Sequence, residues 1–217
     1  MLLFSISAAN AQWSYQTTQD GQYRLGRNGS DLSVEFRAII VTFHVPENWR
    51  ILACTEEPMD WIYSTGSPSG LSLDFRVGSS TGLGKHPGRL PLPEQYRRYL
   101  EQIHAHYDDE VKMSPEATPF HLPDGRRLTP RRYFSDYWDQ RLVLLVPEGE
   151  DTCEFEFSSR RSLSGLRASH DAIQHILDSY RCTHKKPSNQ SMKPTAPSRN
   201  EFSVFATTPC RGLSPSR

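Results

Sequence analysis

Long apolar segments and closely spaced cysteines are both absent from this 217-residue sequence. No stretch approaches the roughly 20 apolar residues that a membrane-spanning helix needs, so we expect no membrane span. The four cysteines form no Cys-x-x-Cys motif. This absence excludes the ligand pattern of a zinc ribbon and the redox motif of a thioredoxin.

A complete phosphate-binding loop is also missing, although the segment "VGSSTGLGKHPG" at residues 77–88 has some of its parts. The motif G-x-x-x-x-G-K-[ST] ending at Gly84-Lys85 requires a glycine where the sequence has Ser79. It also requires a hydroxyl residue after the lysine, where His86 stands. We therefore expect no nucleotide and no other cofactor. We interpret the segment as a flexible connection whose contact groups are Lys85 and His86.

Motifs for nucleophilic catalysis and for metal binding are incomplete in the same way. No G-x-S-x-G elbow occurs. Eight histidines and many serines nevertheless leave an exported hydrolase, built from scattered Ser, His and Asp residues, as the alternative to a binding protein. Two acid–histidine pairs have an i, i+4 spacing that could present two metal ligands on one helix face, namely His104 with Asp108 and Asp171 with His175. Such pairs are more typical of a solvated surface, so we expect no metal site.

The formal net charge of zero conceals a difference between the two parts of the chain. Residues 1–183 contain 19 basic and 24 acidic side chains, whereas residues 184–217 contain six basic and one acidic. Phosphate neutralisation needs a basic face, so the acidic body argues against nucleic-acid binding. The last 34 residues are also rich in proline and serine without periodicity, and we expect them to be a disordered basic tail.

The N-terminal residues predict export. A short apolar run is followed by Ala9-Asn10-Ala11, which has the small-x-small form of a secretory cleavage site. We expect a signal peptide over residues 1–11 and a periplasmic or secreted protein. The segment has no basic residue before its apolar run, so a true start upstream of Met1 or a buried strand are the alternatives.

Cysteine usage is compatible with export. The body contains Cys54, Cys153 and Cys182, and Cys210 lies in the tail. One disulfide plus one thiol is the arrangement favoured in an oxidising compartment. Cys153 and Cys182 could pair if the helix expected to end near Cys182 packs on the strand of Cys153. Buried unpaired thiols are equally consistent with the sequence.

Residue patterns predict one α+β domain over residues 12–183, with a mainly antiparallel sheet packed by two helices. The expected strands cover residues 32–45, 49–52 and 71–77, followed by a hairpin that turns at residues 147–151. The expected helices cover residues 93–111 and 168–181, the second with Ser169 as its N-cap. Turn signals stand at Asn28-Gly29 and Asp124-Gly125.

Basic and aromatic residues alternate in the segment "GRRLTPRRYFSDYWDQR" at residues 125–141. Arginine with tyrosine and tryptophan is the composition of protein-interface hot spots, and it also occurs where single-stranded nucleic acid binds. Alternatively, the aromatic residues enter the core and the arginines are solvated. We predict a binding surface for an unknown protein or anionic partner, with the segment of residues 78–88 nearby. Its residues are Arg126, Arg127, Arg131, Arg132, Tyr137 and Trp138.

Three pieces of the body resemble the bacterial PsbP/Mog1-like α/β/α sandwich group. They are "VTFHVPENWRI" at residues 41–51, "QRLVLLVPEGEDTCEFEFSS" at 140–159 and the closing "ILDSYR" at 176–181. The resemblance covers about residues 13–182, with residues 66–93 unmatched, and implies a binding or assembly module without catalysis. The tail from residue 189 resembles a bacterial dispersed repeat read through in translation. The sequence does not indicate an oligomeric state.

Overall fold

The computed structural model describes residues 13–17, 22–53, 62–68, 70–107, 112–115, 118–134, 141–159 and 169–185. The expected signal peptide and the tail beyond residue 185 lie outside these residues, so both stay predictions. In the described part of the chain, no helix is long and apolar enough to cross a membrane.

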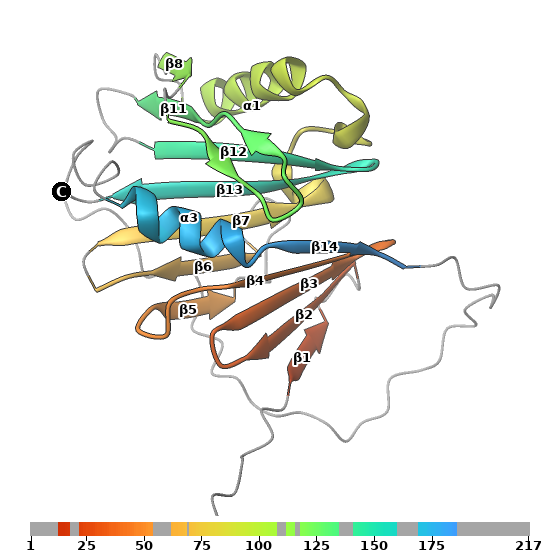
Figure 1. Ribbon diagram of the computed structural model, residues 1–217. Helices are drawn as coiled ribbons and strands as arrows, with labels where there is room; N and C mark the ends of the chain where they lie inside the picture. The colour runs from red at the N-terminus through yellow and green to blue at the C-terminus, as the bar shows by residue number, and fades with distance from the viewer. Residues whose placement is uncertain are drawn as a thin grey trace, which may run out of the picture.

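The N-terminal strands form a five-stranded antiparallel sheet, drawn in red to orange in Figure 1. The last described strand, drawn in blue, completes it beside β4. The predicted hairpin at Asn28-Gly29 is confirmed, because Asn28 pairs with Asp31 across a two-residue turn. In spatial order the strands are β1 (Ser14–Thr17), β2 (Tyr23–Asn28), β3 (Asp31–Phe36), β4 (Ile39–His44) and β14 (Arg181–His184).

A second sheet has seven strands, and its described pairs are all antiparallel. Its strands in spatial order are β5 (Arg50–Ala53), β6 (Tyr63–Gly66), β7 (Leu71–Val77), β13 (Asp151–Ser159), β12 (Arg141–Glu148), β11 (Arg131–Phe134) and β8 (Lys112–Pro115). A small hairpin is formed by β9 (Phe120–His121) and β10 (Arg127–Leu128). The predicted α+β class with mainly antiparallel pairing is confirmed.

The helices lie on opposite faces of the seven-stranded sheet. One core contains apolar side chains of both sheets together with Ile173, Ile176 and Leu177 of α3 (His170–Asp178). A separate core packs α1 (Leu92–Tyr107) against the other face of β11 and β12. The molecule therefore has three layers, in which the seven-stranded sheet is the middle one, and α3 lies in front of it in Figure 1.

The predicted strand over residues 32–45 is wrong as a single element. The chain reverses at Arg37-Ala38, so that Phe36 pairs with Ile39 and two strands form from one apolar run. Arg37 adopts the left-handed conformation with a φ of 51°, which is uncommon outside glycine, asparagine and aspartate. No glycine or proline marks this turn, so the sequence pattern carried no signal for it.

The second helix is shorter than predicted. It ends at Asp178, and Ser169 makes no side-chain capping bond at its start. The chain then enters β14, so Cys182 lies on a strand and not at a helix end. His184, where the predicted tail begins, still pairs with Ile39.

The two described cysteines, Cys153 and Cys182, are free thiols, so of the two alternatives left open by the sequence the structure shows unpaired thiols. Burial raises the pKa of Cys153 well above its usual value. Burial and the neighbouring Glu148 carboxylate raise the pKa of Cys182 to about 12. Cys54 lies outside the described residues.

The glycine-rich connection after β7 contains two short 3-10 helices, η1 (Gly78–Thr81) and η2 (Pro87–Arg89). Its glycines allow close packing. A Cβ atom at Gly78 would lie 2.0 Å from Phe36 Cε1, and one at Gly88 would lie 2.2 Å from the Asp151 carbonyl oxygen. His86 contacts the carboxylate of Glu150 at 3.0 Å.

A charged network is buried between the seven-stranded sheet and α1. Glu154 and Glu156 of β13 are 0% and 2% exposed. Arg76 Nη1 donates a hydrogen bond to Glu154 Oε1 at 2.7 Å, and Arg141 pairs with Glu156. The Tyr99 hydroxyl of α1 donates to Glu156 Oε2 at 2.7 Å. Burial outweighs Arg76 and raises the pKa of Glu154 to about 7. For Glu156 burial acts in the same direction, but the two arginines outweigh it and lower the pKa.

Candidate binding pocket beside Trp49

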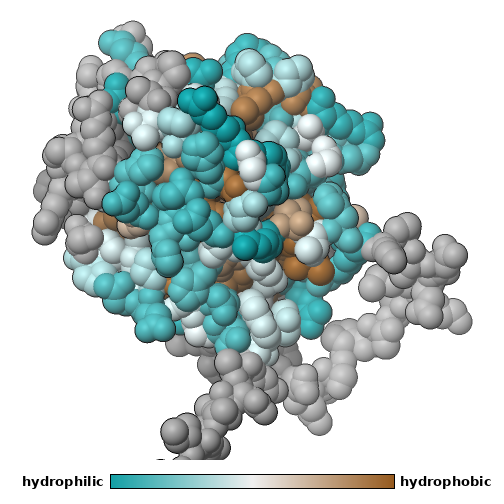
Figure 2. Space-filling model, in the orientation of Figure 1, coloured by the Kyte–Doolittle hydropathy of each residue, from teal (hydrophilic) through white to brown (hydrophobic). Residues whose placement is uncertain are grey.

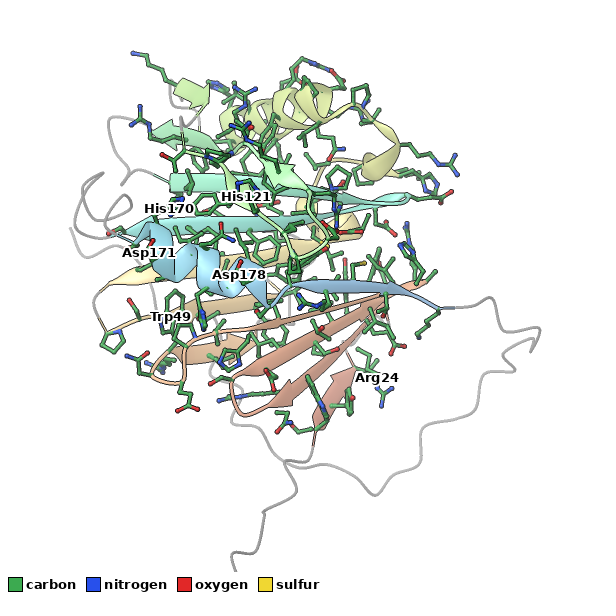
Figure 3. All side chains as sticks on the ribbon, viewed as in Figure 1. Arg24, Trp49, His121, His170, Asp171 and Asp178 are labelled. Atoms are coloured by element: carbon green, nitrogen blue, oxygen red, sulfur yellow. The ribbon has the colours of Figure 1, made fainter. Side chains whose placement is uncertain are left out.

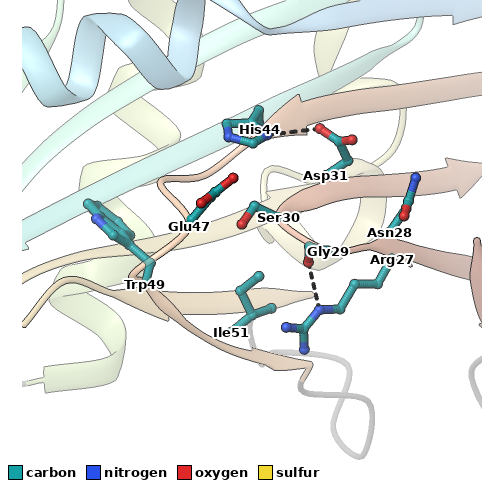
Figure 4. Close-up of a pocket in the computed structure, with 9 residues that line it drawn as sticks. All are labelled: Arg27, Asn28, Gly29, Ser30, Asp31, His44, Glu47, Trp49 and Ile51. Carbon is teal, nitrogen blue, oxygen red and sulfur yellow. Dashed lines mark hydrogen bonds and ion pairs between the residues drawn. The ribbon is translucent and has the colours of Figure 1, made fainter. Parts of the chain in front are cut away.

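A hollow of about 480 Å³ opens where the β2–β3 turn, the end of β4 and the start of β5 come together (Figure 4). Its lining is mostly polar, with one aromatic and one aliphatic side chain. The lining residues are Arg27, Asn28, Gly29, Ser30, Asp31, His44, Glu47, Trp49 and Ile51.

Turn chemistry builds the walls of this pocket. Gly29 has a φ of 59°, the left-handed conformation that a tight two-residue hairpin turn demands. The Ser30 carbonyl accepts a hydrogen bond from the Val45 amide at 3.0 Å, which holds the β2–β3 turn against the end of β4. The Trp49 amide donates to the Pro46 carbonyl at 2.9 Å and closes the turn that leads into β5.

A contact between a carboxylate and an imidazole lies at one side of the pocket. Asp31 and His44 stand directly opposite each other on β3 and β4, and Asp31 Oδ1 lies 2.9 Å from His44 Nδ1. Their side chains are 51% and 35% exposed, so the pair is in contact with solvent. The His44 amide donates to Ser179 Oγ at 2.7 Å, which ties this wall to the end of α3.

Trp49 separates the pocket from a second hollow of about 350 Å³. Trp49 is 7% exposed, and Figure 3 shows it below α3. Across the pocket from Trp49, Arg27 Nε donates to the Gly29 carbonyl at 2.9 Å (Figure 4). The second hollow is lined by Asn48, Trp49, Ser67, Pro68, Leu71, Ser169 and Ala172.

The pocket contains the residue types of a hydrolytic triad, but only two of them are joined. The His44–Asp31 contact matches the carboxylate–imidazole half of such a site. Among the described residues, no hydrogen bond joins the Ser30 hydroxyl to the His44 ring. The geometry therefore provides a base and its carboxylate without an activated nucleophile.

The arginines predicted from sequence lie on several surfaces. Arg126 is used within the fold, because Nη2 donates to Glu148 Oε1 at 2.6 Å and Nε donates to Asp124 Oδ2 at 2.7 Å. Arg127 is exposed on β10, where it pairs with His121. This hairpin is fixed to α3, since Gln174 Nε2 donates to the His121 carbonyl at 2.8 Å.

Arg131 and Arg132 occupy consecutive positions on β11, so their side chains point to opposite faces of the sheet. The Arg131 guanidinium lies 5.5 Å from the centre of the Tyr96 ring of α1. Tyr137 and Trp138 lie outside the described residues. The predicted surface as a group of six residues is therefore untested.

The pocket beside Trp49 was missed by sequence reasoning. Its signals are the Asn28-Gly29 turn and the Pro46-x-x-Trp49 spacing, which indicated a hairpin and a strand break without indicating that the two turns meet. Only the register of β3 with β4 brings Asp31 to His44.

Comparisons with known proteins assign no family to the chain. No protein-family model matches the sequence, and no curated protein matches it. The fold is similar to the solution structure of cyanobacterial PsbP (CyanoP) from Synechocystis sp. PCC 6803. The TM-score is 0.45 at 8% identity, over 81% of this chain and 95% of that one.

Proposed function

We propose that the protein is an exported, non-catalytic binding module that takes a polar polypeptide segment of its partner in the pocket beside Trp49. The observation that carries this proposal is the pair of adjoining hollows that share Trp49. Concave sites with an aromatic wall and a few polar groups are typical of ligand recognition. Two hollows on either side of one indole suit an elongated ligand better than a compact one.

Charges around the pocket indicate a ligand with groups of both signs. Glu47 is exposed at the rim and suits a cationic side chain of the partner, whereas Arg27 suits an anionic one. The body of the chain is acidic, so the partner is more readily a protein than a nucleic acid. The face shown in Figure 2 is mostly hydrophilic, with small groups of hydrophobic residues between.

Selection from a library of random peptides tests the proposal on the full chain. Enriched peptides should bind the wild-type protein, and Arg27→Glu and Glu47→Lys should each weaken binding at least about 10-fold, because each reverses a charge at the rim. Lys85→Glu is the matched control, since Lys85 is exposed on the segment between η1 and η2 and does not line the pocket. Failure to enrich peptides, or equal binding by all variants, would contradict the proposal.

Export is a separate part of the proposal and has its own test. Residues 1–20 fused to a phosphatase that folds only after export should give active enzyme outside the cytoplasm. Mass spectrometry of the exported full chain should show Gln12 as its first residue. An inactive fusion would contradict the proposed export and would leave the proposal about the pocket unchanged.

A hydrolase is the second candidate, and the His44–Asp31 pair is the observation in its favour. The wild-type protein would then hydrolyse small activated esters, and His44→Ala would abolish this activity. Equal ester hydrolysis by wild type and His44→Ala would dismiss it.

A further inference from the structure

Three side chains with different metal-binding atoms converge where the two sheets meet. Glu148 stands at the end of β12, and Cys182 and His184 stand on β14. One potential ligand atom from each residue lies within 4.8 Å of the other two. The cluster lies outside the pocket beside Trp49 and has no role in the proposed function.

Backbone geometry explains why these residues meet. Cys182 and His184 are two positions apart on a strand, so both side chains point to the same face of β14. Glu148 is the last residue of β12 and pairs with Asp151 across the hairpin turn. The imidazole of His184 lies against this turn, since a Cβ atom built on Gly149 would be 3.5 Å from His184 Cε1.

The carboxylate of Glu148 is held in place from behind. Its side chain is 8% exposed, and Oε1 accepts hydrogen bonds from Arg126 Nη2 at 2.6 Å and from the Tyr180 hydroxyl at 2.8 Å. Such outer partners orient a carboxylate ligand and leave its second oxygen to face a metal. Arg126 also supplies a positive charge that balances a site containing both a carboxylate and a thiolate.

The ligand set matches the chemistry of zinc. Thiolate sulfur, imidazole nitrogen and carboxylate oxygen are its usual protein ligands, whereas calcium and magnesium prefer oxygen alone. We propose that Glu148, Cys182 and His184 bind one zinc ion, with water in the fourth position. Binding replaces the proton of the Cys182 thiol, which is released to solvent.

The distances require only a small rearrangement. With bonds of about 2.0–2.3 Å, tetrahedral geometry places ligand atoms roughly 3.3–3.8 Å apart. The three atoms are within 4.8 Å, so closure needs a shift of about 1 Å. His184 is exposed and can rotate to provide it, while Glu148 stays fixed.

Titration of the reduced full chain with cobalt(II), which replaces zinc, tests the site. The wild-type protein should bind one equivalent with a thiolate-to-cobalt charge-transfer band and the visible bands of tetrahedral cobalt. Zinc should displace cobalt and abolish both bands. Absence of the charge-transfer band would overturn the proposal.

Variants assign the signal to this site. His184→Ala should weaken zinc binding at least about 10-fold, since even loss of an outer partner costs about 10–100-fold. Cys182→Ser should abolish the charge-transfer band. Two matched controls should bind zinc as the wild type does. One is the double variant Cys54→Ser/Cys210→Ser, and the other is His175→Ala at an exposed position of α3. A band that survives Cys182→Ser, or that disappears in the Cys54/Cys210 control, would overturn the assignment.

Discussion

Two carboxyl groups on β13, two residues apart, differ in their protonation because their neighbours differ. Glu156 accepts a hydrogen bond from the Tyr99 hydroxyl and forms an ion pair with Arg141, whereas Glu154 forms an ion pair with Arg76. Glu154 Oε2 accepts no hydrogen bond within the described residues. Full burial therefore raises the pKa of Glu154 to about 7 while that of Glu156 is lowered.

Stability should depend on the protonation of Glu154 near neutral pH. The folded pKa lies above the usual 4.5, so the folded state binds the proton more tightly than the unfolded state. This contribution is fully present below about pH 4.5 and is lost as the pH rises through about 7. Urea unfolding at pH 5 to 8 should show up to about 3 kcal/mol of pH-dependent loss in wild type. Glu154→Gln should abolish most of that slope.

Glu101→Gln provides the control for this measurement, because Glu101 is 60% exposed on α1. It should keep the wild-type slope. A Glu154→Gln variant with an unchanged slope between pH 5 and 8 would show that Glu154 does not titrate there.

Gly88 is a residue at which packing leaves no room for a side chain. Because it has none, η2 can approach the β12–β13 hairpin, and the Gly88 amide donates a hydrogen bond to the Glu150 carbonyl at 3.0 Å. Gly88→Ala should destabilise the protein by about 1–3 kcal/mol or more, because the added methyl overlaps backbone oxygens. Gly66→Ala should change stability little, since its nearest neighbours are 3.5 Å away and neither glycine has a positive φ. Equal melting temperatures for the two variants would contradict this account.

At the scale of elements, β14 joins the last described residues to the N-terminal sheet. It pairs with β4 through Arg181–His184, and Lys185 continues the contact by bonding its amide to the Ala38 carbonyl at 2.7 Å. Removing residues 186–217 should leave the melting temperature unchanged, whereas removing residues 181–217 should lower it by at least about 5 °C through loss of an edge strand. Similar melting temperatures for both truncations would show that β14 adds no stability.

Elements with a clear period could be predicted from sequence, and elements that depend on pairing could not. The strand predicted over residues 71–77 is found at Leu71–Val77, and the helix predicted from residue 93 is found at Leu92–Tyr107. The turn at Arg37 could not be found, since nothing local distinguishes one long apolar strand from two short ones. β14 could not be predicted, because its four residues have mixed polarity and pair only with β4, which is distant in the sequence.

At the scale of the whole molecule, the seven-stranded sheet is shared by two cores. Leu144 faces the five-stranded sheet, and its neighbour Leu145 faces α1. Leu144→Ala and Leu145→Ala should each cost about 2–5 kcal/mol, and each should shift one common unfolding transition because β12 belongs to both cores. Near- and far-ultraviolet circular dichroism should give the same midpoint. Separate midpoints in Leu145→Ala would show that α1 unfolds on its own.

The candidate sites could not be predicted from the sequence, because they depend on how whole sheets come together. Asp31 with His44, and Glu148 with Cys182, are brought together by strand register and by the meeting of two sheets. Arg126 was predicted as a binding residue because its segment is rich in arginine and aromatic residues. In the structure its guanidinium already forms ion pairs with Glu148 and Asp124. Local composition indicates which residues can bind and does not indicate which are already occupied.

The position of β14 at the end of the described chain has a consequence during synthesis. Ile39 pairs with His184, so the fourth strand emerges from the ribosome well before its partner. At about 5–20 residues per second, the roughly 145 residues between them take about 7–30 s to make. During this time the edge of β4 is an open template for other strands. A nascent chain stalled before Arg181 should therefore associate with itself or with a chaperone more than a released one.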